Sequence, residues 1–105
     1  MPWTINFHET ARAETDELSL DFRTKFERLM ELIRQHGLDH VPPKAAKHIS
    51  GELWELRIKG KDGIVRAFYV TRSGQRLLIV RVFVKKTQKT PPREIRLALQ
   101  RAEEV

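Results

Sequence analysis

The sequence contains no cysteine, which excludes disulfide bridges and cysteine-ligated zinc sites. Long apolar runs are also missing. The longest aliphatic stretch, Leu77 to Val80, ends at Arg81, whereas a membrane-spanning helix needs roughly 20 apolar residues. The first ten residues, MPWTINFHET, have neither the basic start nor the apolar centre of an export signal. We therefore expect a cytoplasmic protein that does not enter the membrane.

Acidic residues are scarce in the C-terminal two-thirds of the chain. The 105 residues carry 20 Lys and Arg against 14 Asp and Glu, a net charge of +6. Residues 1–40 hold five basic and eight acidic residues, net −3, whereas residues 41–105 hold fifteen and six, net +9. Such a basic region favours a polyanion partner, most simply nucleic acid, although many small basic domains bind none. The length predicts a single domain, residues 1–105.

Apolar periodicity predicts an α+β fold. Residues 39–51 contain two adjacent prolines and are expected to form a loop, and Thr90 is a candidate N-cap for the last helix. The order of elements predicts an antiparallel sheet with helices packed on one face. The expected strands span 3–8, 52–58, 64–70 and 77–85, and the expected helices span 9–17, Ser19 or Asp21 to Gly37, and 93–104.

Alternation in the last three strands assigns their side chains to two faces. In the middle strand, one register would bury Arg66 without a partner, at a cost of several kcal/mol, so we assign Arg66 to the open face. The predicted core face holds Trp54, Leu56, Ile58, Val65, Ala67, Tyr69, Leu78, Val80, Val82 and Val84.

Three arginines of the open face are predicted to form a row. Loops of four and six residues would pair Arg57 with Arg66, and Arg66 with Arg81. Like charges placed opposite each other destabilise a sheet by up to about 1 kcal/mol per pair. An anion over the row, most simply a phosphodiester backbone, would explain the arrangement. The alternative is that Glu55 and solvent neutralise the row and nothing specific binds there.

Other residues extend this candidate site. Lys85 and Lys86 continue the positive surface beyond the strand end, and Lys89 follows in the same basic run. Phe83 offers a flat ring on the same side for base stacking. We therefore predict that Arg81, Phe83 and Lys89 contact RNA.

Three segments carry a resemblance to a known family. LWELRIKG (53–60), the pattern G-x-x-R-A-F-Y (63–69) and VFVKKTQKTPPREIRLALQRAEE (82–104) together resemble the HigB-type, phage-derived branch of the RelE/ParE toxin superfamily. The resemblance implies a βααβββα fold and a bacterial type II toxin, a ribonuclease that enters the ribosomal A site and cuts mRNA. It also implies a cognate antitoxin, usually an acidic or helix-turn-helix protein that covers the basic face.

The resemblance also implies roles for particular residues. Arg66 falls where the RelE-like pattern has an arginine that grips the scissile phosphate, and Arg57 lies at a second basic position. Many RelE-like proteins have a functional Tyr or His after the last strand. This chain departs from that pattern, since its single tyrosine is Tyr69 and no histidine follows His48.

RNA cleavage by the 2′-hydroxyl without a metal needs a proton acceptor, a proton donor and a group that stabilises the phosphorane. Arginine suits the last role because its planar fork matches phosphate oxygens, so we assign it to Arg57 and Arg66. Lys85 and Lys86 are candidates for proton transfer. Glu55 is either a base or an ion-pair partner that holds Arg57. The four histidines lack ligand spacing on one element, so no metal or other cofactor is expected.

Three functions therefore remain open. The first is a ribosome-dependent endoribonuclease toxin, which the KKTQKTP run favours. The second is a non-enzymatic inhibitor of DNA gyrase on the same fold, as in the ParE branch, and the missing C-terminal Tyr or His keeps it open. The third is a basic RNA-binding module.

Overall fold

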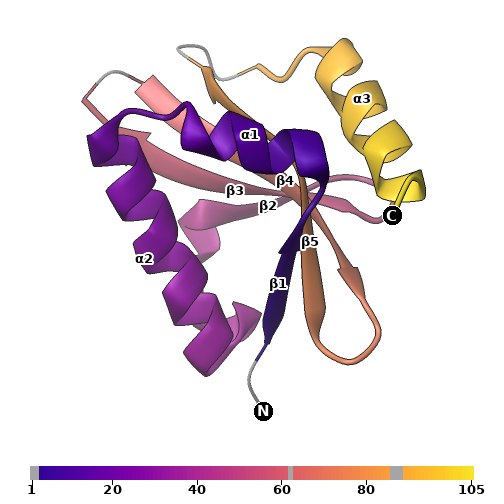
Figure 1. The fold of residues 1–105 in the computed structure, drawn as a ribbon, viewed down its shortest axis with the longest axis horizontal. Helices are drawn as coiled ribbons and strands as arrows, with labels where there is room; N and C mark the ends of the chain where they lie inside the picture. Colours follow the sequence, from indigo (N-terminus) through magenta and orange to yellow (C-terminus); the bar gives the residue numbers. More distant parts are fainter. Residues whose placement is uncertain (1–2, 62, 86–88) are drawn as a thin grey trace.

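A five-stranded sheet forms the centre of the fold in the computed structural model, which describes residues 3–61, 63–85 and 89–105 (Figure 1). The strand order is β1-β5-β4-β3-β2, in which β1 runs parallel to β5 and the other pairs are antiparallel. The elements are β1 (Thr4–Phe7), α1 (Glu9–Asp16), α2 (Leu20–His36), the 3₁₀ turns η1 (Leu38–His40) and η2 (Pro43–Ala45), β2 (Ala46–Ser50), β3 (Leu53–Gly60), β4 (Gly63–Arg72), β5 (Arg76–Lys85) and α3 (Pro92–Glu103). The predicted α+β class is confirmed, and β2 is an addition within the expected loop.

Local sequence signals set the limits of α2. The Ser19 hydroxyl accepts a hydrogen bond from the backbone N–H of Phe22, as an N-cap does, and Gly37 ends the helix with φ of 87°. The apolar stripe of the helix packs on one face of the sheet and shares a core with residues of β3, β4 and β5. The buried residues of this first core include Phe22, Phe26, Met30, Ile33, Leu56, Ile58, Val65, Ala67, Tyr69, Leu77, Ile79 and Val82.

A β-bulge in β5 makes part of the predicted register wrong. Tyr69 pairs with Ile79 but Phe68 pairs with Arg81, so Val80 is an extra residue on β5. Arg66 lies opposite Phe83 rather than Arg81, because the hairpin closes between Arg72 and Arg76, which shifts the predicted register by one residue, and the bulge shifts it by one more. Pairing of Arg57 with Arg66 is confirmed.

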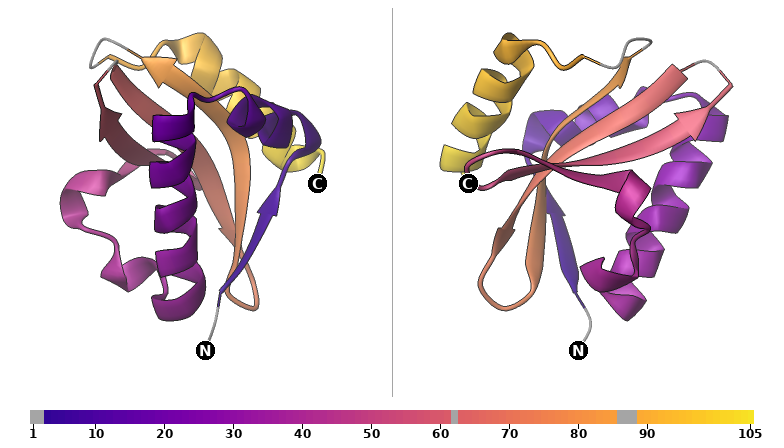
Figure 2. Two further views of the ribbon diagram at one scale, coloured as in Figure 1. Left: turned by 60° about the vertical axis from the view of Figure 1, so that its left-hand side comes forward. Right: turned by 180° about the vertical axis from the view of Figure 1, so that it is seen from behind.

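The bulge also creates a second apolar core on the other face of the sheet. Leu78 and Val80, predicted to face the first core, turn to this side because the extra residue shifts the alternation. Helix α3 covers this core, so helices lie on both faces of the sheet and not on one (Figure 2). The buried residues of the second core are Leu53, Phe68, Val70, Leu78, Val80, Ala98 and Ala102.

Three further predictions about single residues were wrong. Trp54 and Val84 were assigned to the core, but they are 40% and 43% exposed because each lies near the end of its strand. The N-cap of α3 is Pro91 rather than Thr90, and no side chain caps this end. In the described part of the chain, no helix has the length and apolar character needed to cross a membrane.

Candidate functional site

Glu55 binds two arginines on the face of the sheet that α3 partly covers. Its Oε1 atom accepts a hydrogen bond of 2.7 Å from Nη1 of Arg66 and another of 2.6 Å from Nε of Arg57. The side chains of Glu55 and Arg66 are fully buried, whereas that of Arg57 is 24% exposed. The carboxylate therefore compensates the repulsion between the two opposed arginines, and Arg57 is the arginine that faces solvent. We call these three residues the Glu55 cluster.

Arg81 does not join the predicted row, because the observed register places it opposite Phe68 and not opposite Arg66. It instead links three elements: its guanidinium donates to Glu94 of α3 at 3.0 and 3.1 Å and to Glu14 of α1 at 2.5 Å. Burial opposes the charged form of Arg81, but the hydrogen bond with Glu94 and the negative charges of Glu14 and Glu94 raise its pKa above the ordinary value. Arg81 is therefore engaged by two carboxylates within the protein.

Phe83 lies beside the Glu55 cluster, opposite Arg66 in the sheet. Its ring meets the edge of Phe68 at a centroid distance of 5.4 Å, and the Arg81 guanidinium carbon is 5.1 Å from its centroid. Phe83 is thus half-buried and already holds intramolecular ring contacts. The predicted stacking on a base would have to use the remaining exposed part of the ring.

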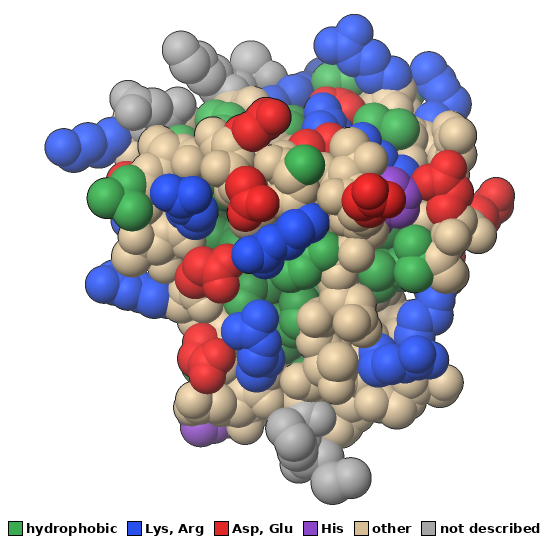
Figure 3. Space-filling model, viewed as in Figure 1, with side chains coloured by type: hydrophobic (Ala, Val, Ile, Leu, Met, Phe, Trp, Pro, Cys, Tyr) green, Lys and Arg blue, Asp and Glu red, His purple; other side chains and the backbone are tan. Residues whose placement is uncertain are grey.

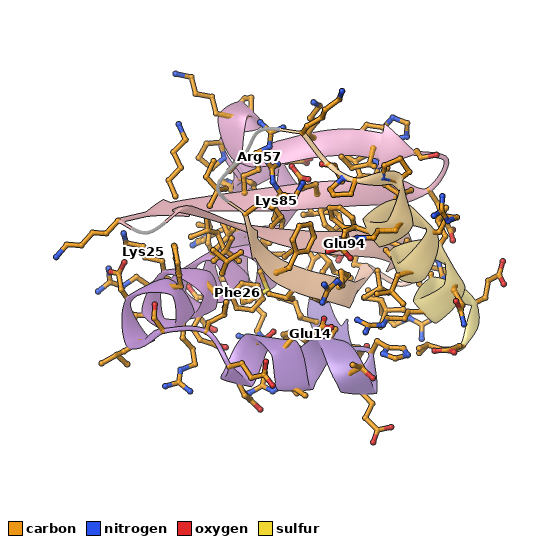
Figure 4. The ribbon with its side chains drawn as sticks, turned by 90° about the horizontal axis from the view of Figure 1, so that it is seen from above. Glu14, Lys25, Phe26, Arg57, Lys85 and Glu94 are labelled. Atoms are coloured by element: carbon orange, nitrogen blue, oxygen red, sulfur yellow. The ribbon has the colours of Figure 1, made fainter. Side chains whose placement is uncertain are left out.

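Lys85 ends β5 on the same face, and its ammonium group donates to the backbone carbonyl of Lys89. Figure 4 shows Lys85 and Arg57 near each other, away from Phe26 of the first core. Lys89 is exposed. Lys86, the other candidate for proton transfer, lies outside the described residues.

Lys47 is a basic residue near this site that our sequence reasoning missed. It is exposed on β2, and the sheet register places it directly opposite Glu55. Together with His48, Lys89 and Thr90 it lines a cavity of about 420 Å³. Because residues 39–51 were expected to form a loop, no register was available for Lys47. A sequence signal for this strand was nevertheless present. Gly51 follows directly after β2 and adopts a positive φ of 54° in the turn to β3, as a glycine between two paired strands often does.

The surface of the protein carries both paired and unpaired cations. On the face that carries α1 and α2, acidic and basic side chains are interspersed (Figure 3), and the helices contain ion pairs such as Lys25 with Asp21 and Arg34 with Glu31. Around α3 and β2, four exposed cations have no ion pair within the described residues. They are Lys47, Lys89, Arg93 and Arg96.

Other candidates for proton transfer lie elsewhere. Tyr69 is 3% exposed in the first core, as predicted, and burial raises its pKa to about 12. Nε2 of His48 is 2.8 Å from the carbonyl oxygen of Gly51. Among the described residues, no group of three or more His, Asp or Glu side chains could hold a metal ion.

Comparison with known proteins gives one family and one fold. The family model described as phage-derived protein Gp49-like matches residues 13–103. A double arginine-to-alanine mutant of the E. coli toxin RelE in the free state superposes with a TM-score of 0.65 and 15% sequence identity, over 96% of this chain and 98% of that one. The RelE–RelB complex of the archaeon Pyrococcus horikoshii OT3 gives a TM-score of 0.57 and 14% identity, over 80% and 96% of the respective chains. No curated protein sequence matches the chain.

Proposed function

Because the chain belongs to the family of phage-derived Gp49-like proteins and has the fold of RelE, we propose that it is the toxin of a type II toxin–antitoxin pair. Within that class we propose a HigB-type, ribosome-dependent endoribonuclease that cleaves mRNA in the A site. The observation that supports cleavage most directly is the Glu55 cluster, which holds a carboxylate and two guanidinium groups together.

The reaction that fits this cluster is attack of the RNA 2′-oxygen on the adjacent phosphorus. The bond from phosphorus to the 5′-oxygen breaks, leaving a 2′,3′-cyclic phosphate and a 5′-hydroxyl end. Arg57, which reaches solvent, would bind the phosphate oxygens and stabilise the charge of the phosphorane. Glu55 is fully buried, so its role would be to orient Arg57, whereas Lys85 and Lys86 would accept the proton of the 2′-hydroxyl and protonate the leaving 5′-oxygen.

The burial of Arg66 supports a different role from the one that the family pattern implies. Its side chain is fully buried and bonded to Glu55, so a phosphate meets Arg57 first. Arg66 would then act through Glu55, by orienting the carboxylate that also binds Arg57. We therefore propose that Arg66 is a positioning residue.

The proposed partners are an antitoxin and mRNA in the ribosomal A site, both met in the cytoplasm. One structural neighbour is a complex of RelE with RelB, and this supports an antitoxin for the present chain. We propose a helix-turn-helix antitoxin that covers the face of Lys47, Lys85 and Lys89, where basic side chains are exposed or half-exposed.

The experiment is induced expression in bacteria, followed by growth measurement and mapping of mRNA 5′ ends by primer extension. We expect growth arrest and new ends within translated codons. Arg57→Gln should abolish both, since it removes the exposed guanidinium but leaves the Glu55–Arg66 pair. Arg12→Gln is the matched control, because Arg12 is an exposed arginine of α1 far from the cluster.

Other outcomes would select the alternatives. Growth arrest with gyrase-linked DNA damage and no new mRNA ends would favour a ParE-like inhibitor, which the distant position of Tyr69 and the lack of histidine after His48 keep open. Normal growth with RNA bound in vitro would favour a binding module. Full toxicity of folded Arg57→Gln would refute the assignment of the Glu55 cluster.

A further inference from the structure

A pocket lined by aromatic side chains lies on the opposite side of the sheet from the Glu55 cluster. Its volume is about 440 Å³, and its walls include Trp3, Asp39, Trp54 and Tyr69. Trp54 and Glu55 are neighbours in β3, so their side chains point to opposite faces of the sheet. The pocket is therefore separate from the proposed cleavage site.

Tertiary structure brings these residues together from distant parts of the chain. Trp54 and Tyr69 lie opposite each other in β3 and β4. The backbone N–H of Trp3 bonds the carbonyl of Arg34 at 3.0 Å, which fixes the first tryptophan beside the end of α2. Gly37 permits this approach, because a Cβ atom there would lie 3.0 Å from Nε1 of Trp3. Asp39 then follows in η1.

The polar groups of this pocket have no partners in the described part of the protein. The Tyr69 residue is 97% buried, yet its hydroxyl makes no hydrogen bond with any described residue. The carboxylate of Asp39 likewise has no ion pair there, and no described lysine or arginine lines the pocket. Burial raises the pKa of Tyr69 to about 12, so the phenol stays neutral at physiological pH.

We propose that this pocket binds the guanidinium group of an arginine side chain presented by a partner protein. Indole and phenol faces attract cations, and a planar guanidinium stacks on an indole while donating hydrogen bonds to a carboxylate. Asp39 supplies the carboxylate and the Tyr69 hydroxyl supplies a neutral acceptor. A nucleotide fits less well, because its phosphate would meet Asp39 with no lining cation to compensate. The inference does not depend on catalysis, although an antitoxin would be the partner under the proposed function.

The test is a titration of the folded protein with N-acetyl-arginine amide, followed by NMR. The chain has two tryptophans and both line the pocket, so the two indole N–H signals report on it directly. N-acetyl-citrulline amide is the matched probe, since it has nearly the same shape and no charge. We expect saturable shifts of both indole signals with the arginine probe and at least about fivefold weaker binding of the citrulline probe, because one lost cation–π or charge contact of about 1 kcal/mol changes affinity that much.

Variants separate the pocket from general electrostatics. Asp39→Asn should weaken binding of the arginine probe about threefold, which corresponds to a loss below 1 kcal/mol. Glu103→Gln makes the same change of charge at an exposed site of α3 and should leave this binding unchanged. Trp54→Leu should weaken binding of the arginine probe as well. Because Trp54 is 40% exposed, we expect this variant to remain folded. Equal binding of both probes, no shift at either indole, or stronger binding of uridine monophosphate would each overturn the proposal.

Discussion

Glu55 and Arg66 form a completely buried ion pair, with 2.7 Å between Oε1 and Nη1. A buried charge is tolerated only when its partner and further hydrogen bonds compensate the loss of water. Glu55 meets this need for two arginines at once, since Arg57 bonds the same oxygen. The cluster thus ties the stability of β3 and β4 to residues that we assign to RNA cleavage.

Removing the carboxylate should destabilise the protein strongly. Glu55→Ala leaves Arg66 buried without this anion, so we expect the free energy of unfolding to fall by about 3–5 kcal/mol in urea denaturation. Glu31→Ala is the control, because Glu31 forms an exposed pair with Arg34, and its loss should cost less than about 1 kcal/mol. Similar losses for the two variants would contradict the central role of Glu55.

The docking of α3 should depend on Glu14 of α1. Its carboxylate binds Arg81 at 2.5 Å, Arg101 of α3 at 2.9 Å and the backbone N–H of Val82 at 3.0 Å. We expect Glu14→Ala to lower stability by about 2–4 kcal/mol and to speed amide hydrogen exchange in α3. The exposed Glu17 offers a control substitution to Ala. Unchanged exchange in α3 would argue against this link.

Close packing of β3 against α2 should make Gly60 irreplaceable. A Cβ atom at Gly60 would lie 2.3 Å from Cε1 of Phe22, whose ring is buried and has little room to move. Gly60→Ala should therefore lower stability by about 1–3 kcal/mol. Adding Phe22→Leu should recover part of that loss, so a double-mutant cycle in urea should give a favourable coupling. Purely additive losses would place the cost elsewhere.

High pH should destabilise the fold through Tyr69. Its pKa is raised by burial from 10.0 to about 12, so the folded state holds the proton more tightly than the unfolded state. The stabilisation is complete below pH 10 and is lost as pH rises toward 12, by about 2–3 kcal/mol in total. As the chain has one tyrosine, tyrosinate absorbance reports this group alone. Tyr69→Phe should lose this part of the pH dependence, and an ordinary titration near pH 10 in the folded protein would contradict the argument.

Hydrophobic periodicity and hairpin spacing predicted much of the fold and the pairing of two arginines in the candidate site. The pairing of Arg57 with Arg66 followed from a short hairpin and from the cost of burying an arginine on the wrong face. That argument assumed a buried arginine without a partner, however, and Arg66 is in fact buried with one, Glu55. The register between β3 and β4 was therefore correct, but the assignment of Arg66 to an open face was wrong, because its side chain is fully buried beside Glu55.

The sequence by itself determined the helices, the three long strands and the hairpin that opposes two arginines, because these depend on contacts within one turn or between neighbouring strands. Only the tertiary structure decided the fate of Arg81, whose partners Glu14 and Glu94 are 67 and 13 residues away. The same holds for the bulge at Val80, which lets β5 present apolar side chains to α2 on one face and to α3 on the other. The partners of Arg81 and the position of the bulge depend on how side chains pack on both faces of the sheet. The periodicity of one strand contains no information about the elements that pack on it.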